Sequence, residues 1–195
     1  MGKIKILILT DSNGNPRGFP ESEVFYPEET YASHLREHYK DVFFWQLSIG
    51  DITTIQLINH LISYLSHWIP DIIIVQSGIN DCVPGAYSLE KFQRALKKFK
   101  MIYSASKIFW MEICSGDKYE EKLPGVTRLK NEHNTVIRRI YGENFIELQD
   151  ALNKGGGINA SDHVHMSKKG HQIIKRNLIR KIDQYLSSSL AGVDK

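Results

Sequence analysis

A small set of residues in this 195-residue chain could together carry out acyl transfer. Ser12 offers a hydroxyl nucleophile, which is weak unless an adjacent base removes its proton. His165 offers such a base, because histidine titrates near neutral pH, and Asp162 lies three residues before it. A carboxylate on the far ring nitrogen orients a catalytic imidazole and stabilises its protonated form. These residue types predict a catalytic triad of Ser12, His165 and Asp162.

Two further positions could donate hydrogen bonds to the oxyanion that acyl transfer creates. Gly50 has an unhindered backbone N–H, and Asn80 has a side-chain amide. The backbone N–H of Ser12 could be a third donor, and one such donor typically contributes roughly 10²–10³ in rate. We therefore expect an oxyanion hole made of Ser12, Gly50 and Asn80, with Asp11 and Asp81 holding the loops beside it.

The histidines near the end of the chain leave two alternatives open. His163 is a rival base, although the Asp-x-x-His spacing favours His165. The group of Asp162, His163, His165 and His171 could also suggest a metal site. No His-Glu-x-x-His motif or cysteine pairing accompanies that group, so we predict no metal and no cofactor.

The elements that must position these residues alternate along the chain. Aliphatic runs predict buried strands, and the four consecutive β-branched residues within 71–76 are typical of a central parallel strand. Asp51 is expected to cap a helix that starts near Thr53. The predicted strands are 3–10, 42–47, 71–76, 107–113 and 144–148, and the predicted helices are 27–39, 53–68, 88–101, 124–141 and 167–186.

Five strands that alternate with helices predict an α/β fold, a three-layer α/β/α sandwich with a parallel sheet. The flavodoxin-like strand order 2-1-3-4-5 would gather the candidate residues at one edge of that sheet. No repeat or linker divides the chain. We predict a single domain over residues 1–186, a flexible loop at Asn153–Gly157 and a flexible tail over residues 187–195.

Composition and charge limit the partners that we expect. The formal net charge of +3 gives no strong pointer to nucleic acid, and the basic residues of the last predicted helix are expected to form a solvated face. The apolar run at residues 4–9 is too short for a signal peptide or a membrane span, so we expect a cytoplasmic protein without membrane insertion. Cys82 and Cys114 form no Cys-x-x-Cys pair and are expected to be reduced thiols.

Four motifs resemble those of the SGNH hydrolases, also called GDSL esterases. The family's Gly-Asp-Ser-(Leu/Asn) block resembles Thr10–Asn13, and its second block, centred on one glycine, resembles Ser48–Asp51. Its Gly-x-Asn-Asp block matches Gly78–Asp81, and its Asp-x-x-His block matches Asp162–His165. Each motif is weak alone, but the four occur in the family's order and span essentially the whole chain.

This resemblance implies a role for each candidate residue. Ser12 would be the nucleophile, His165 the base and Asp162 its partner. Gly50 and Asn80 would join the Ser12 N–H in the oxyanion hole. The resemblance also implies a flavodoxin-like fold and no metal.

The chain departs from the family pattern at two places. Thr10 stands where the family usually has glycine, which puts the family's backbone path before Ser12 in question. The loop from Asn13 to Tyr26 is long, so the shape of the family's pocket is not carried over.

The resulting hypothesis is a serine esterase that hydrolyses short-chain acyl esters, chiefly acetyl esters, through an acyl-serine intermediate. The chain has no apolar lid segment for a long lipid tail, and a carbohydrate as the alcohol is an analogy with the family. One alternative is an O-acyltransferase with the same triad, which modifies a polysaccharide. The other is a non-catalytic carbohydrate-binding domain, which the complete set of candidate residues disfavours.

Overall fold

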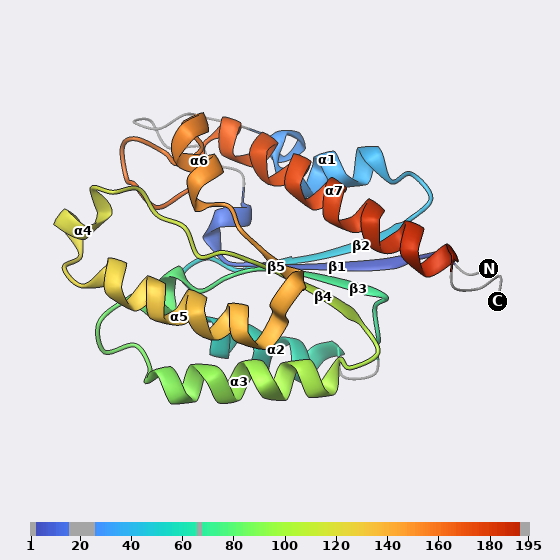
Figure 1. Cartoon of the computed structure of the whole chain (residues 1–195), viewed down its shortest axis with the longest axis horizontal. Coiled ribbons are helices and arrows are strands. Elements are labelled where there is room, and N and C mark those ends of the chain that lie inside the picture. Colours follow the sequence, from blue (N-terminus) through green and yellow to red (C-terminus); the bar gives the residue numbers. More distant parts are fainter. Residues whose placement is uncertain (1–2, 16–25, 66–67, 192–195) are drawn as a thin grey trace.

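A five-stranded parallel sheet forms the middle layer of the structure, a computed structural model that describes residues 3–15, 26–65 and 68–191. The strand order β2-β1-β3-β4-β5 confirms the predicted flavodoxin-like order (Figure 1). Every side chain of β1 and β3 except Lys5 is buried, as expected for central parallel strands. The strands are β1 (Lys5–Thr10), β2 (Phe43–Ser48), β3 (Ile72–Gln76), β4 (Lys107–Met111) and β5 (Phe145–Ile146).

Helices cover both faces of this sheet (Figure 1). Because alternate residues of a strand point to opposite faces, β1 contributes to two apolar cores. Ile6 and Ile8 pack in the core that α1 and α7 cover, whereas Leu7 and Leu9 pack in the core that α2, α3 and α5 cover. One face carries α1 (Tyr31–His38), α6 (Gln149–Gly155) and α7 (Lys168–Ala191), and the other carries α2 (Thr54–Leu65), α3 (Leu89–Ile102) and α5 (Val126–Tyr141).

The first predicted helix, 27–39, divides into two pieces. Pro27–Glu29 forms a separate 3₁₀ turn, η2, and α1 begins only after it. The Thr30 hydroxyl oxygen accepts a hydrogen bond from the Ser33 N–H, which caps α1. The capping residue Thr30, three residues beyond the proline, therefore sets the start of the helix.

The last helix is longer than predicted. It continues to Ala191, because no glycine or proline interrupts the chain between residue 186 and Gly192. Residues 187–191 of the predicted flexible tail are therefore helical, and the rest of that tail lies outside the described residues. The strands predicted at 3–10, 107–113 and 144–148 and the helix predicted at 124–141 form over somewhat shorter segments.

The segment Asn153–Gly157, predicted to be a flexible loop, instead contains the end of α6 and a glycine that packs closely against α7. α6 runs to Gly155, and Gly156 ends it with a positive φ of 63°. A Cβ at Gly170 would lie 2.0 Å from the carbonyl oxygen of Gly157, so these two backbones can pack together only as glycines.

Several short elements have no counterpart among the predicted ones. Segments of three to seven residues are too short to show helical periodicity in the sequence. No described helix is both long and apolar enough to span a membrane. Besides α6, the short elements are α4 (Tyr119–Lys122), η1 (Ser12–Gly14), η3 (Ile79–Cys82) and η4 (Gly142–Asn144).

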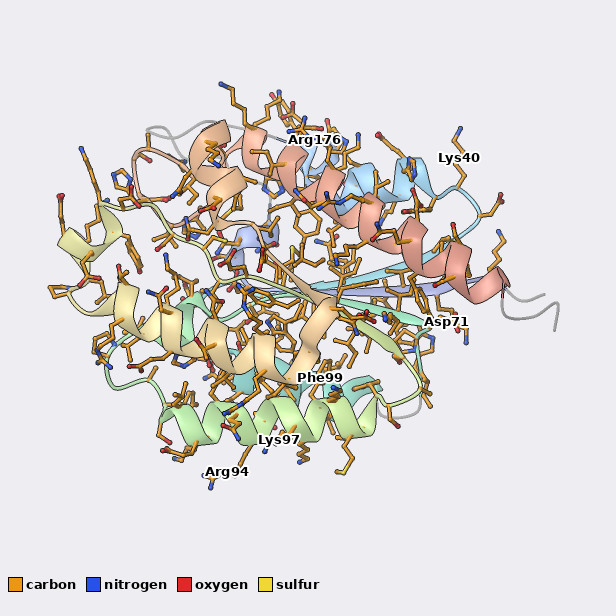
Figure 2. The ribbon with its side chains drawn as sticks, in the orientation of Figure 1. Lys40, Asp71, Arg94, Lys97, Phe99 and Arg176 are labelled. Carbon is orange, nitrogen blue, oxygen red and sulfur yellow. The ribbon has the colours of Figure 1, made fainter. Side chains whose placement is uncertain are left out.

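Helix α3 offers a test of this layering. Phe99 lies on the side of the helix that faces the sheet and is fully buried, whereas Lys97 points away from the sheet and is exposed (Figure 2). We expect Phe99→Ala to lower the free energy of unfolding by about 3–5 kcal/mol, because it removes a buried aromatic ring and leaves a cavity. Lys97→Ala should change it by less than about 0.5 kcal/mol. Urea unfolding followed by circular dichroism measures both, and equal effects would contradict the assigned faces.

Candidate active site

The carboxyl ends of β1, β2 and β3 bring the predicted residues of three turns to one edge of the sheet. Thr10, at the end of β1, lies in register with Ser48 of β2 and Gln76 of β3. The turns that follow these three strands carry Ser12, Gly50 and Asn80. Ligands bind at this edge of open α/β sheets, since the strand order reverses between β1 and β3.

The loop before α7 completes this arrangement with a continuous chain of hydrogen bonds. The Ser12 Oγ lies 2.9 Å from the Nε2 of His165, and the Nδ1 of His165 lies 2.9 Å from the Oδ2 of Asp162. The other carboxylate oxygen of Asp162 accepts hydrogen bonds from the backbone N–H groups of Val164 and His165, each at 2.9 Å. The aspartate therefore fixes both the imidazole ring and the turn that carries it.

The electrostatics of this hydrogen-bonded triad favour an ionised Asp162. Burial raises the pKa of Asp162, but hydrogen bonds from His165 and Val164 outweigh that effect and hold the pKa well below its usual range. An ionised Asp162 accepts the Nδ1–H of His165, which leaves the Nε2 lone pair to accept a proton from the Ser12 hydroxyl.

Three donors lie on the turns beside Ser12. Within the described part of the chain, no acceptor is bonded to the backbone N–H of Ser12 or of Gly50. The Asn80 Nδ2 donates to the carbonyl oxygen of Ile52 at 2.9 Å, and a primary amide has a second N–H beyond that one. Open space surrounds Gly50, since a Cβ built there would meet no atom within 4 Å.

The turn that carries Gly50 is tied to η3 by two neighbouring side chains. Asn80 holds the carbonyl of Ile52, and the Oδ2 of Asp81 accepts the N–H of Thr54 at 2.7 Å. The two turns with the predicted oxyanion donors are therefore linked directly. Nothing in the sequence around Thr54 signals this contact, because its partner lies 27 residues away.

The predicted capping role of Asp51 is wrong. Asp51 adopts a positive φ of 55°, and the start of α2 is capped by a neighbour. The Thr53 hydroxyl oxygen accepts the Gln56 N–H, and the Gln56 side-chain oxygen accepts the Thr53 N–H at 3.0 Å. This reciprocal pair is a capping box, which leaves Asp51 free to turn the chain.

The turn that carries Ser12 accommodates Thr10, which stands where the SGNH motif usually has glycine. Thr10 stays in β1, fully buried, and its hydroxyl donates to the carbonyl oxygen of Asp11 at 3.0 Å. A Cβ at Gly14 would lie 2.3 Å from the Thr10 side chain, so the space that Thr10 occupies requires glycine four residues later. The Asp11 Oδ1 accepts the Asn13 N–H at 2.9 Å and caps the η1 turn that presents Ser12.

Two buried carboxylates lie beneath the site. Burial raises the pKa of Asp11 to about 6, against the hydrogen bonds from Asn13 and the attraction of His165, and the charge of Asp81 raises it further. Burial also raises the pKa of Asp81, and hydrogen bonds from Thr54 oppose that shift. Asp11 and Asp81 thus each accept a backbone N–H in one of these two turns, at the expense of burying a carboxyl group.

Neither His163 nor His171 joins this chain of hydrogen bonds. It is His165, and not the rival His163, that lies against Ser12. His171 lies between α1 and α7, where its Nδ1 accepts the Tyr31 N–H at 3.1 Å. Among the described residues, no group of three or more His, Cys, Asp or Glu side chains is placed to hold a metal ion.

Two sequence-based predictions concern residues next to the site. Cys82 and Cys114 are both free and buried, in agreement with the predicted reduced thiols. The long loop from Asn13 to Tyr26 lies largely outside the described residues, which resume at Tyr26.

Comparison with known proteins identifies the fold. No family model matches the chain, and no curated protein matches its sequence. Solved structures do match. The psychrotrophic esterase EstA from Pseudoalteromonas sp. has a TM-score of 0.69 and 21% identity, over 94% of this chain and 98% of that chain. A lipase/acylhydrolase from Enterococcus faecalis has a TM-score of 0.75 and 16% identity, over 93% of this chain and 96% of that chain.

An acetylxylan esterase, Axe2 from Geobacillus stearothermophilus, is similar as well. Its TM-score is 0.70 at 22% identity, over 93% of this chain and 95% of that chain. At such identities the likeness establishes the fold alone. The chain has the α/β fold of these esterases over nearly its whole length, which confirms the fold that the SGNH resemblance implies.

The buried Asp11 gives a pH-dependent test of this site. Its pKa of about 6 in the folded protein exceeds the ordinary 3.8, so the folded state binds the proton more tightly than the unfolded state. Below pH 4 this carboxyl therefore contributes roughly 3 kcal/mol to the free energy of unfolding, since each unit of the difference between the two pKa values is worth about 1.4 kcal/mol. That contribution is lost as the pH rises through 6.

Asp11→Asn keeps the oxygen that caps η1 and removes the titration. We expect the unfolding free energy of Asp11→Asn, measured relative to wild type by urea titration, to rise by about 2–3 kcal/mol between pH 4 and pH 7.5. A difference between the two proteins that stays constant across this range would show that Asp11 titrates normally.

Proposed function

We propose that this protein is a carboxylic ester hydrolase with Ser12 as its nucleophile. The observation that carries the proposal is the unbroken hydrogen-bonded chain from Ser12 through His165 to Asp162. The donors of Ser12, Gly50 and Asn80 lie on the neighbouring turns. This combination supplies a nucleophile, a base, an orienting carboxylate and an electrostatic partner for an oxyanion.

The reaction follows from these groups. The Nε2 of His165 removes the Ser12 proton as Oγ attacks the ester carbonyl carbon, and Asp162 stabilises the imidazolium. The carbonyl oxygen becomes an oxyanion, which accepts hydrogen bonds from the N–H groups of Ser12 and Gly50 and from the Asn80 amide. The tetrahedral intermediate then breaks its bond to the alcohol, which leaves with the proton from His165.

A water molecule completes the cycle. His165 takes a proton from water, and the resulting hydroxide equivalent attacks the acyl group on Ser12. The second tetrahedral intermediate releases the carboxylic acid and returns the proton to the serine oxygen. The steps as written use only side chains and backbone N–H groups of this chain, water and the ester.

We infer that the preferred substrate is a short acyl ester, chiefly an acetyl ester, of a carbohydrate. Two similar structures support this class, since both Axe2 and AlAXEase are acetyl xylan esterases by name. The absence of an apolar lid segment in the sequence also favours a short acyl group. The carbohydrate as the alcohol part of the ester rests on analogy with these two structures.

A series of p-nitrophenyl esters tests the acyl preference and the nucleophile together. We expect wild type to hydrolyse the acetate faster than the butyrate and the octanoate. Ser12→Ala should lose about 10³-fold or more in kcat, because no other described hydroxyl meets His165 Nε2. Release of p-nitrophenol measures both rates, and equal turnover by the two proteins would exclude Ser12 as the nucleophile.

The same series separates hydrolysis from transfer. Addition of xylo-oligosaccharide as an acceptor should leave the rate of p-nitrophenyl acetate turnover unchanged in a hydrolase. A rate that rises with acceptor concentration would instead identify an O-acyltransferase. No turnover with or without acceptor would point to a binding domain.

The neighbouring histidines provide a matched pair for the base. His163 has a positive φ of 61°, a conformation that asparagine adopts readily, so His163→Asn should fold normally. We expect His165→Asn to lower kcat by about 10³-fold or more, and His163→Asn to lower it by less than about 10-fold. Steady-state kinetics on p-nitrophenyl acetate measure both, and the reverse ranking would make His163 the base.

A further inference from the structure

The chain beyond β4 passes close to the histidine loop, the segment Asp162–His165 before α7, and is held there by side chains. Two side-chain amides each bind both backbone groups of one residue. The Asn134 amide accepts the Ile113 N–H at 2.9 Å and donates to the Ile113 carbonyl at 3.0 Å. The Gln149 amide does the same for Ser115, at 3.1 and 2.9 Å. Asn134 on α5 and Gln149 on α6 thus take the place of a neighbouring strand.

Lys130 lies at the centre of this arrangement. Only 8% of the residue is exposed, and its ammonium group donates to the Ser115 Oγ and to the Gln149 Oε1, each at 2.9 Å. No carboxylate in the described part of the chain lies within 4 Å of it, so both partners are neutral. A buried charge with neutral partners is costly to keep, which singles out the position of Lys130.

The segment that Lys130 holds is bonded directly to the histidine loop. The Gly116 N–H donates to the His163 carbonyl oxygen at 2.7 Å. A Cβ at Gly116 would lie 3.1 Å from the His163 Cβ, so the two backbones are in close contact. His163 has the left-handed φ of 61° that turns the chain toward His165. A displacement of Gly116 would therefore displace His163 and the turn that carries the His165 imidazole.

We propose that Lys130 is a positioning residue for His165, and that it acts through Ser115, Gly116 and His163. The ammonium group fixes the Gln149 oxygen and the Ser115 hydroxyl, and these fix the backbone that supports the histidine loop. The inference deepens the proposed function and rests on it. Small displacements of a catalytic group can cost as much as roughly 100-fold in rate, so a distant support of this kind is measurable.

Lys130→Met keeps the length and volume of the side chain and removes its three donors. We expect kcat for p-nitrophenyl acetate to fall about 10-fold while KM changes less than about 2-fold, because the substrate-binding groups stay in place. The control is Lys100→Met, since the Lys100 ammonium also donates a hydrogen bond to another element, in its case to the backbone carbonyl of Ile140 on α5, at 2.6 Å. Lys100 lies on α3, and its substitution should leave kcat and KM unchanged.

A double-mutant cycle tests the route. Gly116→Ala should itself lower kcat, because its Cβ presses on His163. If Lys130 acts through Gly116, Lys130→Met should cost less in the Gly116→Ala background than in wild type. Effects on log kcat that simply add would overturn the proposed route.

A spectroscopic readout keeps the test independent of turnover. The proton between His165 Nδ1 and Asp162 Oδ2 should give a low-field ¹H NMR resonance, assigned by its loss in His165→Asn. We expect this resonance to shift or broaden in Lys130→Met and to stay unchanged in Lys100→Met. If wild type hydrolyses no ester, the proposed function fails while this signal still reports the position of His165.

The outcomes are distinct even if the first variant is unstable. Circular dichroism and thermal melting establish whether Lys130→Met folds. If it does not, Ser115→Ala removes only the hydroxyl that Lys130 holds and should reproduce the fall in kcat and the change in the resonance. A folded Lys130→Met or Ser115→Ala with the wild-type kcat and resonance would overturn the proposal.

Discussion

The hydrogen bond between Ser12 and His165 joins two residues 153 positions apart, and most of the structure serves to make that bond possible. Local sequence cannot hold such a contact, because the entropy of closing so long a loop must be offset elsewhere. The buried sheet offsets it. β1 ends in the turn that carries Ser12, and α7 packs on the same core as β1, so the segment before α7 returns to that turn.

The site is stable because several costly features are compensated by neighbouring groups. Asp11 and Asp81 bury carboxylates whose pKa values rise as a result, yet each binds a backbone N–H that would otherwise lack an acceptor. Thr10 fills a position close to Ser12, and Gly14 leaves room for it. Strain and buried charge of this kind concentrate where a fold must place reactive groups.

Support for the histidine loop comes from outside the motifs that identify the site. Lys130, Asn134 and Gln149 lie on two helices and bind the backbone that continues β4. None of them lies in a recognisable motif, and each contributes by geometry rather than by reactivity. An active site built from loops gains rigidity when side chains of fixed helices satisfy the backbone of those loops.

The sequence by itself determined the strand order and the residues that the sheet edge brings together. Apolar periodicity and four polar motifs carry that information, because burial on both faces and turn chemistry act on neighbouring residues. Only the tertiary structure decided that Thr53 rather than Asp51 caps α2, that Gly157 packs on Gly170, and that Lys130 binds Ser115 and Gln149. Those outcomes depend on contacts between segments far apart in the chain, which local patterns do not encode.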